Sequence, residues 1–267
     1  MSGQLSLTLF AHVCGRPDDE LDLGEAALLL AEIDQPNGRG VDLPRARALL
    51  DALGEGARAA IARAEAEAEA EAKAKAKAAP SFEQVFARRV QALARFVHDE
   101  AGFHGNDEDY YDPKNSFLDE VLARKTGIPI SLAVVLIEVG RRAGVTLQGV
   151  SFPGHFLVRA EMPDGLFLID PFSGQLIDRA ALRALHARAT GDDRDPPARL
   201  LEPAGKRAIL LRMLANLRGI YAARSDDEHL RAVLERMQVL APSEELRREI
   251  ARLGGSAPFR SAGRALN

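Results

Sequence analysis

A serine, a histidine and an aspartate follow one another along this chain at positions where their side chains can do nucleophilic chemistry together. Ser131 lies at the start of an apolar helical stretch, His155 at the start of a strand-like segment and Asp170 at the end of the next one. An imidazole can take the proton of a serine hydroxyl, and a carboxylate can fix the tautomer of that imidazole. Backbone N–H groups at a helix start can stabilise an oxyanion. The pattern predicts a Ser131–His155–Asp170 triad acting on amide or ester bonds.

Each of these residues also has a purely structural interpretation. A serine in the first turn of a helix commonly caps the helix or bonds a backbone carbonyl. His155 follows Pro153 and Gly154, which are typical of a turn, and Asp170 precedes a proline, as turn-starting aspartates often do. A hydroxyl also needs more help from its base than a thiol does. Both interpretations stay open on these residues alone.

The helix that carries Ser131 is expected to lie in the core. Residues 129–143 are apolar around most of the helix circumference, which is typical of a buried helix. Pro129 suits the first helical position, where its missing N–H costs nothing, and Gly144 closes the helix. We expect Leu136 and Ile137 to be buried.

A β-hairpin is expected to carry the histidine and the aspartate. The segments HFLVRAE and LFLID flank the turn sequence MPDG at 162–165. If Met162 and Gly165 close the turn, His155 and Asp170 are diagonal neighbours on one face of the sheet. A further strand is expected over 145–152.

Helical periodicity and capping residues predict helices along the rest of the chain. Ser116 and Asp119 approximate a capping box, so a helix should run from there to Gly127. Ser81 should cap another helix after Pro80. The helices expected elsewhere cover 22–34, 43 into 65–78, 82–101, 179–189, 205–223, 227–241 and 243–253.

The stretch EAEAEAEAKAKAKA at 65–78 alternates every two residues but consists of strong helix formers and poor strand formers. Pairs such as Glu69 and Lys73 are spaced i,i+4, and each contributes about 0.3 kcal/mol on an exposed helix. The stretch therefore predicts a solvated spacer helix without a binding role.

Composition bounds the class of protein. The chain has 267 residues, of which 46% are hydrophobic and 28% charged, as in an ordinary globular protein of one or two domains. There is no apolar run of about 18 residues and no basic segment before the short apolar run at the start, so neither a membrane span nor a signal peptide is expected. The single cysteine, Cys14, suits a reducing cytoplasm.

The distribution of charge argues against a nucleic-acid-binding surface, and the spacing of the acidic residues argues against a metal site. Residues 203–267 hold 12 Lys/Arg against 7 Asp/Glu, a balance of +5, so the total of −4 leaves −9 elsewhere. The positive residues alternate with acids along helices, which indicates solvated faces rather than a nucleic-acid patch. The acids of the loop at 102–113 lack the ligand spacing of a calcium-binding loop. We expect no metal, no other cofactor and no nucleic-acid partner.

The motifs resemble a known family. The Gly-x-Pro opening of the helix at 129–143, the FPGHFLV segment, the LIDPF segment and the run YYDPKNSFLDEVLARKTGIPISL resemble the transglutaminase-like fold. More narrowly, they resemble the bacterial SirB family, regulators of sirC expression with a transglutaminase-like domain and tetratricopeptide repeats. The resemblance is strongest over 102–178 and extends weakly to 22–34 and 82–101.

By position, the resemblance places Ser131 near the family's nucleophilic cysteine, His155 at its histidine and Asp170 at its aspartate. The serine lies further beyond the preceding glycine than that cysteine does, so the alignment can instead place Pro129 there. Either way the thiol is absent, because Cys14 lies far outside the motif.

The resemblance implies an α+β, papain-like (transglutaminase-like) core at 80–190, preceded by a helical region at 1–79. Residues 198–255 are expected to form tetratricopeptide-like helices, with a flexible tail at 256–267. We expect a cytoplasmic, non-catalytic regulatory protein that binds a protein partner through its cleft or its C-terminal helices. The alternative is a serine-dependent hydrolase or acyltransferase using Ser131, His155 and Asp170. The oligomeric state stays open.

Overall fold

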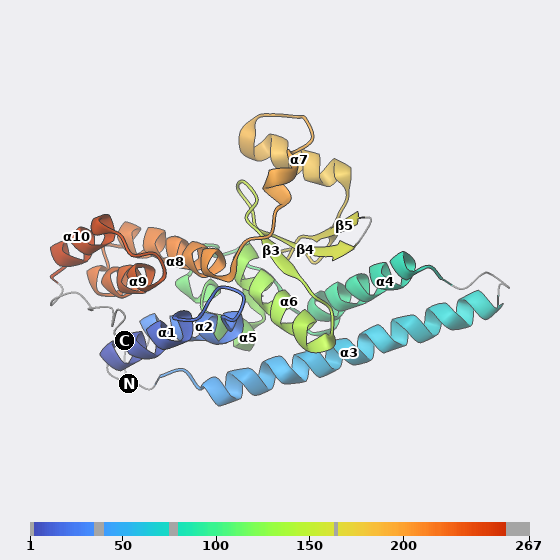
Figure 1. Ribbon diagram of the computed structural model, residues 1–267, viewed down its shortest axis with the longest axis horizontal. Coiled ribbons are helices and arrows are strands. Elements are labelled where there is room, and N and C mark those ends of the chain that lie inside the picture. The colour runs from blue at the N-terminus through green and yellow to red at the C-terminus, as the bar shows by residue number, and fades with distance from the viewer. Residues whose placement is uncertain (1–2, 35–39, 75–79, 163–164, 255–267) are drawn as a thin grey trace, which may run out of the picture.

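The computed structural model describes residues 3–34, 40–74, 80–162 and 165–254, and it shows a helix-dominated α+β fold with two small sheets (Figure 1). The helices are α1 (Gly3–Cys14), α2 (Leu23–Leu30), α3 (Leu43–Ala74), α4 (Phe82–Arg95), α5 (Leu118–Arg124), α6 (Pro129–Ala143), α7 (Arg179–Thr190), α8 (Lys206–Ala223), α9 (Asp227–Leu240) and α10 (Glu244–Arg252). The strands are β1 (His104–Gly105), β2 (Thr126–Gly127), β3 (Gln148–Val150), β4 (Leu157–Met162), β5 (Gly165–Ile169) and β6 (Leu176–Ile177). Among the described residues, every helix is too short or too polar to cross a membrane.

Helix α6 forms the centre of the core, as its apolar circumference predicts. Every residue from 129 to 136 is buried, and the helix contacts α2, α3, α5, α8 and β4 (Figure 1). Leu136 is fully buried, whereas Ile137 is only partly buried, so the expectation for Ile137 was too strong. The predicted ends are confirmed: Pro129 is the first helical residue, and Gly144 ends the helix at a φ of 78°.

The four-stranded sheet has the antiparallel order β3-β4-β5-β6. Met162 pairs with Gly165 and Val158 with Ile169, which is the register that the turn sequence predicts. Residues 163 and 164 of that turn lie outside the described residues. Strand β3 is shorter than the expected 145–152, because the Val145 amide donates to the Gly140 carbonyl and thereby belongs to the C-terminal cap of α6.

Helix α5 differs from its prediction at both ends. It begins at Leu118 without a side-chain cap, because the Ser116 amide instead closes a short 3₁₀ turn by donating to Pro113. It ends at Arg124, and Lys125 takes the left-handed conformation expected of a glycine. Gly127 lies beyond, in β2, where it pairs in parallel with Gly105 of β1. The capping box at Ser116 was therefore a wrong prediction.

Asp119, in the first turn of α5, has a half-buried carboxyl group with one enclosed oxygen, and replacing it should make the protein more stable at high pH. Burial raises its pKa to about 6, and its Oδ1 has no hydrogen-bond partner among the described residues. The folded pKa lies above the unfolded one, so stability falls as pH rises between these values. We expect Asp119→Asn to raise the free energy of unfolding by about 1–3 kcal/mol at about pH 8 and by nearly nothing at about pH 4. Urea denaturation at both pH values, with Glu120→Gln as the control, measures this; an equal effect at both pH values would contradict it.

Residues 1–79 were expected to be a helical region, but α1 was not predicted as a separate helix. It carries a short apolar face that includes Phe10, Val13 and Cys14, and it packs on α2 and α9. This contact places the N-terminal helix against the C-terminal helical segment (Figure 1). One buried cluster includes residues of α1, α2, α3, α6, α8 and α9, so the core is continuous across the predicted segment boundaries.

The long helix α3 packs on the core with its first half and extends into solvent with its second. Its buried residues include Leu50, Ala57 and Ile61, where it lies along α4 and α6 (Figure 1). Toward its end most residues are exposed, and Lys73 pairs with Glu69 at 2.8 Å in the open. Residues 75–78 of the expected spacer lie outside the described residues.

Candidate functional site

The structure brings His155 and Asp170 together. His155 lies in the turn before β4, and its Nε2 is 2.9 Å from the Oδ1 of Asp170, which follows β5. Both side chains are mostly buried, with 15% and 17% exposed. The aspartate also accepts hydrogen bonds from the Phe172 amide and the Ser173 hydroxyl. Burial alone would raise the pKa of Asp170, but the bonds from His155, Phe172 and Ser173 outweigh it and leave the pKa lowered. The carboxylate is therefore ionised and orients the imidazole.

The third predicted residue, Ser131, lies elsewhere. It is fully buried, and its hydroxyl lies 2.5 Å from the Asn115 carbonyl and 3.1 Å from the Ile128 carbonyl. The hydroxyl also accepts from the Ile128 amide at 3.1 Å. Among the described residues it has no hydrogen bond to His155. A Cβ at Gly127 would approach the Ser131 hydroxyl to 2.7 Å, so the glycine before the helix gives this serine room to fold back on the chain.

Asn115 connects Ser131 to the loop formed by residues 106–112. Its side chain is fully buried and bonds the side chains of Asn106 and Arg124 and the carbonyls of Asp109 and Tyr110. Buried amides that make all their hydrogen bonds hold loops in a single conformation. The segment YYDPKNSF was recognised in the sequence, but this role of its asparagine was not.

Pro129, rather than Ser131, lines a small cavity beside His155. The cavity has a volume of ≈ 40 Å³, and it is lined by Tyr110, Ile128, Pro129, Ile130, Gly154, His155, Phe156, Arg212 and Asn216. Proline has no nucleophilic atom. The chain's single thiol, Cys14, is buried at the end of α1, and burial raises its pKa to about 12. The residue at the start of α6 that lines this cavity together with His155 thus offers neither a thiol nor a hydroxyl.

Arg212 forms one wall of this cavity. Its guanidinium donates to the Ser151 hydroxyl at 2.8 Å and to the His155 carbonyl at 3.1 Å, and it lies over the Phe156 ring. It thereby fixes the turn that presents the imidazole. Asn216 follows one helical turn later and lines the same cavity. Sequence reasoning missed both residues; the signal was two polar side chains spaced i,i+4 on α8.

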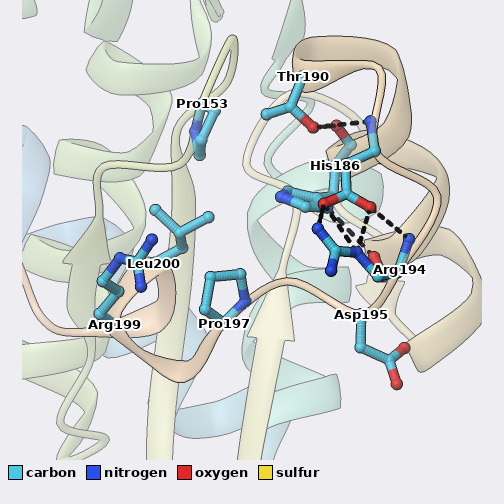
Figure 2. Close-up of a pocket in the computed structure, with 9 residues that line it drawn as sticks. Pro153, His186, Thr190, Arg194, Asp195, Pro197, Arg199 and Leu200 are labelled. Atoms are coloured by element: carbon cyan, nitrogen blue, oxygen red, sulfur yellow. Dashed lines mark hydrogen bonds and ion pairs between the residues drawn. The ribbon is translucent and has the colours of Figure 1, made fainter.

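A larger cavity of ≈ 490 Å³ lies where the 153–156 loop meets α7 and the segment after it. Figure 2 shows Pro153, Pro197 and Leu200 on one side of this cavity, and His186, Thr190 and Arg194 on the other. Asp195 points away from them, toward its ion pairs with Arg179 and Arg183. His186 is buried and bonds the Arg194 carbonyl, which makes it part of the wall. The predicted triad residues line none of this cavity.

Residues 45–215 match a family model described as the transglutaminase-like superfamily. A UPF0162 protein from Xylella fastidiosa strain Temecula1 is 34% identical over 248 residues, which are 91% of this chain and 80% of the relative. A second UPF0162 protein, from strain 9a5c, is 41% identical over 160 residues, 58% of this chain and 57% of the relative. F-box only protein 21 of Mus musculus is 43% identical over 70 residues, 26% of this chain and 11% of that protein. No solved structure matches this chain significantly.

Proposed function

Because this chain belongs to the transglutaminase-like superfamily, we propose that it is a non-catalytic protein-binding module on a scaffold that elsewhere carries a nucleophilic cysteine. The observation that carries this proposal is Pro129 beside His155, with Ser131 turned into the core. Acyl transfer requires a nucleophile within hydrogen-bond reach of its base. The base His155 and its orienting aspartate Asp170 are present, but among the described residues no cysteine, serine or threonine lines the cavity beside His155.

The geometry of Ser131 supports a structural role for this residue. Its hydroxyl proton is engaged by a backbone carbonyl, and its buried position leaves no face for a substrate. Its oxygen accepts from the Ile128 amide, the reverse half of a capping box. This is the structural interpretation that helix-start serines commonly have.

One observation favours the second candidate, a serine-dependent hydrolase or acyltransferase. The His155–Asp170 pair is arranged as a base and its orienter, and the first turn of α6 lines the same cavity through Pro129 and Ile130. Catalysis by Ser131 would require its hydroxyl to leave the Asn115 carbonyl and turn toward the imidazole.

The remaining part of the proposal concerns the C-terminal helices. We propose that α8–α10 form a tetratricopeptide-like unit in a cytoplasmic regulatory protein, as the SirB resemblance implies. Four residues, Leu217, Tyr221, Leu240 and Pro242, have the spacing of one such repeat; the first three are buried and Pro242 is exposed. A single repeat cannot bury its own apolar face, and this unit covers its face by packing on α1, α2 and α6.

A serine-directed fluorophosphonate probe tests the absence of catalysis. We expect the purified wild-type chain to remain unlabelled at Ser131, because the hydroxyl is buried and has no bond to its predicted base. Intact-protein mass spectrometry followed by peptide mapping measures the labelling, and His155→Ala is the matched variant. Stoichiometric labelling of Ser131 that disappears in His155→Ala would establish the serine enzyme and overturn the proposal.

A further inference from the structure

The cavity at the start of α6 carries a positive charge and no acid. Arg212 is the cation among its lining residues, and within the described part of the chain no aspartate or glutamate lines it. Asp170, the acid of the site, is bonded to His155, Phe172 and Ser173. Arg212 itself bonds a hydroxyl and a carbonyl, both of which are neutral. The guanidinium charge is therefore available to an anion in the cavity.

The first turn of α6 adds a hydrogen-bond donor to the same cavity. The residue at its N-cap is Ile128, whose side chain has no acceptor for the first-turn amides. The Ser131 hydroxyl serves the Ile128 amide. Among the described residues, the amide of Ile130, a residue that lines the cavity, has no hydrogen-bond acceptor. Such an amide is satisfied by solvent or by a ligand, and the dipole of this helix favours a negative one.

The size of the cavity and the residues around it limit which anion can bind there. A volume of ≈ 40 Å³ is roughly three times what a single water needs, which suits a group as small as a carboxylate. Three aromatic rings cluster beside it: Tyr110 lies 5.4 Å from Tyr111 and 6.4 Å from Phe172, centre to centre. Tyr111 is 72% exposed. Exposed aromatic side chains beside an arginine are typical anchors of protein interfaces.

We propose that this cavity binds a carboxylate carried by a partner polypeptide, with Arg212 as the charged contact and the Ile130 amide in the first turn of α6 as a donor. Asn216 and Tyr110 line the cavity and supply further polar contacts, and the aromatic cluster receives the residues next to the carboxylate. The proposal rests on the proposed function, because it gives the binding module its ligand where an enzyme would hold its substrate. The carboxylate is either a chain terminus or an acidic side chain.

Chemical-shift titration of the full chain with four blocked amino acids distinguishes these sources. The acids are N-acetylalanine, which carries a terminal carboxylate, and N-acetylglutamate α-methylamide, which carries a side-chain carboxylate. Their neutral counterparts are N-acetylalanine methylamide and N-acetylglutamine methylamide. We expect at least one acid to shift the amides of Ile130, His155 and Arg212, and both neutral compounds to leave them unchanged. The acid with the larger effect identifies the source.

Arg212→Gln should weaken binding of that acid by about tenfold or more, because a charge-assisted contact is lost. Arg218→Gln, on the same helix but paired with Glu249, should bind as the wild type does. The comparison of the two carboxylate compounds with their neutral counterparts uses only the wild-type chain. It therefore tests the proposal even if Arg212→Gln unfolds. Equal shifts from acids and amides, or undiminished binding in a folded Arg212→Gln, would overturn the proposal. The titration measures binding and requires no catalysis. Its failure can therefore be told apart from a failure of the proposed function, which would appear as labelling of Ser131 by the fluorophosphonate probe.

Discussion

Truncating Leu136 to alanine should lower the free energy of unfolding by about 2–5 kcal/mol. The side chain is fully buried in the middle of α6, which itself packs against other helices and the four-stranded sheet. The loss combines the transfer free energy of the removed atoms with the cost of a cavity that rigid neighbours cannot fill. Urea denaturation followed by circular dichroism at 222 nm measures the change.

Leu49→Ala provides the matched control for this prediction. Leu49 is 41% exposed on α3, so the same truncation there removes little buried surface. We expect a loss below about 1 kcal/mol. If Leu136→Ala costs no more than Leu49→Ala, α6 is not the centre of the core.

Replacing Asn115 by alanine should cost about 2–4 kcal/mol, because four part-buried hydrogen bonds of this fully buried side chain are lost at once. The Asn106 and Arg124 side chains and the carbonyls of Asp109 and Tyr110 all bond the Asn115 side chain. The backbone carbonyl that holds Ser131 is unaffected by the substitution. We therefore expect a loss of stability together with faster hydrogen exchange in residues 106–112, while α6 keeps its protection.

The exposed neighbour Lys114 supplies the control. Lys114→Ala should change stability by less than about 0.5 kcal/mol and leave the exchange of the loop unchanged. Uniformly faster exchange across the chain in Asn115→Ala would show that the asparagine supports the whole fold rather than the loop above the cavity.

The sequence predicted those parts of the fold that depend on local chemistry. The apolar circumference of α6 placed it in the core, and the MPDG turn gave the register that brings His155 beside Asp170. The capping serine of α4 was also predicted, and it forms a full capping box with Gln84.

Tertiary packing decided the parts that the sequence did not predict. Ser116 has a capping residue's side chain, but the 3₁₀ turn before α5 uses its backbone instead. Helix α1 has no capping signal and exists because Phe10 and its neighbours pack on α2 and α9. Arg212 reaches the His155 turn from a helix far along the chain, a contact that no local pattern encodes.

The placement of the nucleophile depended on rotation about one helix. Both Pro129 and Ser131 lie in the first turn of α6, and spacing alone left either as the residue facing His155. Two positions along a helix differ by roughly 200° around its axis, so only one of them can face the imidazole. The structure turns Pro129 to the cavity and Ser131 to Asn115.

Alkylation of an introduced thiol tests this placement most directly. Pro129→Cys and Ser131→Cys are each combined with His155→Ala, and iodoacetamide labelling of each cysteine is followed by peptide mapping. Cys14, buried and with a raised pKa, serves as the unreactive internal reference. We expect Cys at 129 to react about tenfold faster than N-acetylcysteine amide, since a helix N-terminus and a nearby imidazole lower a thiol pKa. His155→Ala should remove that excess, and Cys at 131 should react more slowly than the free thiol. Fast, His155-dependent alkylation at 131 but not at 129 would contradict the account.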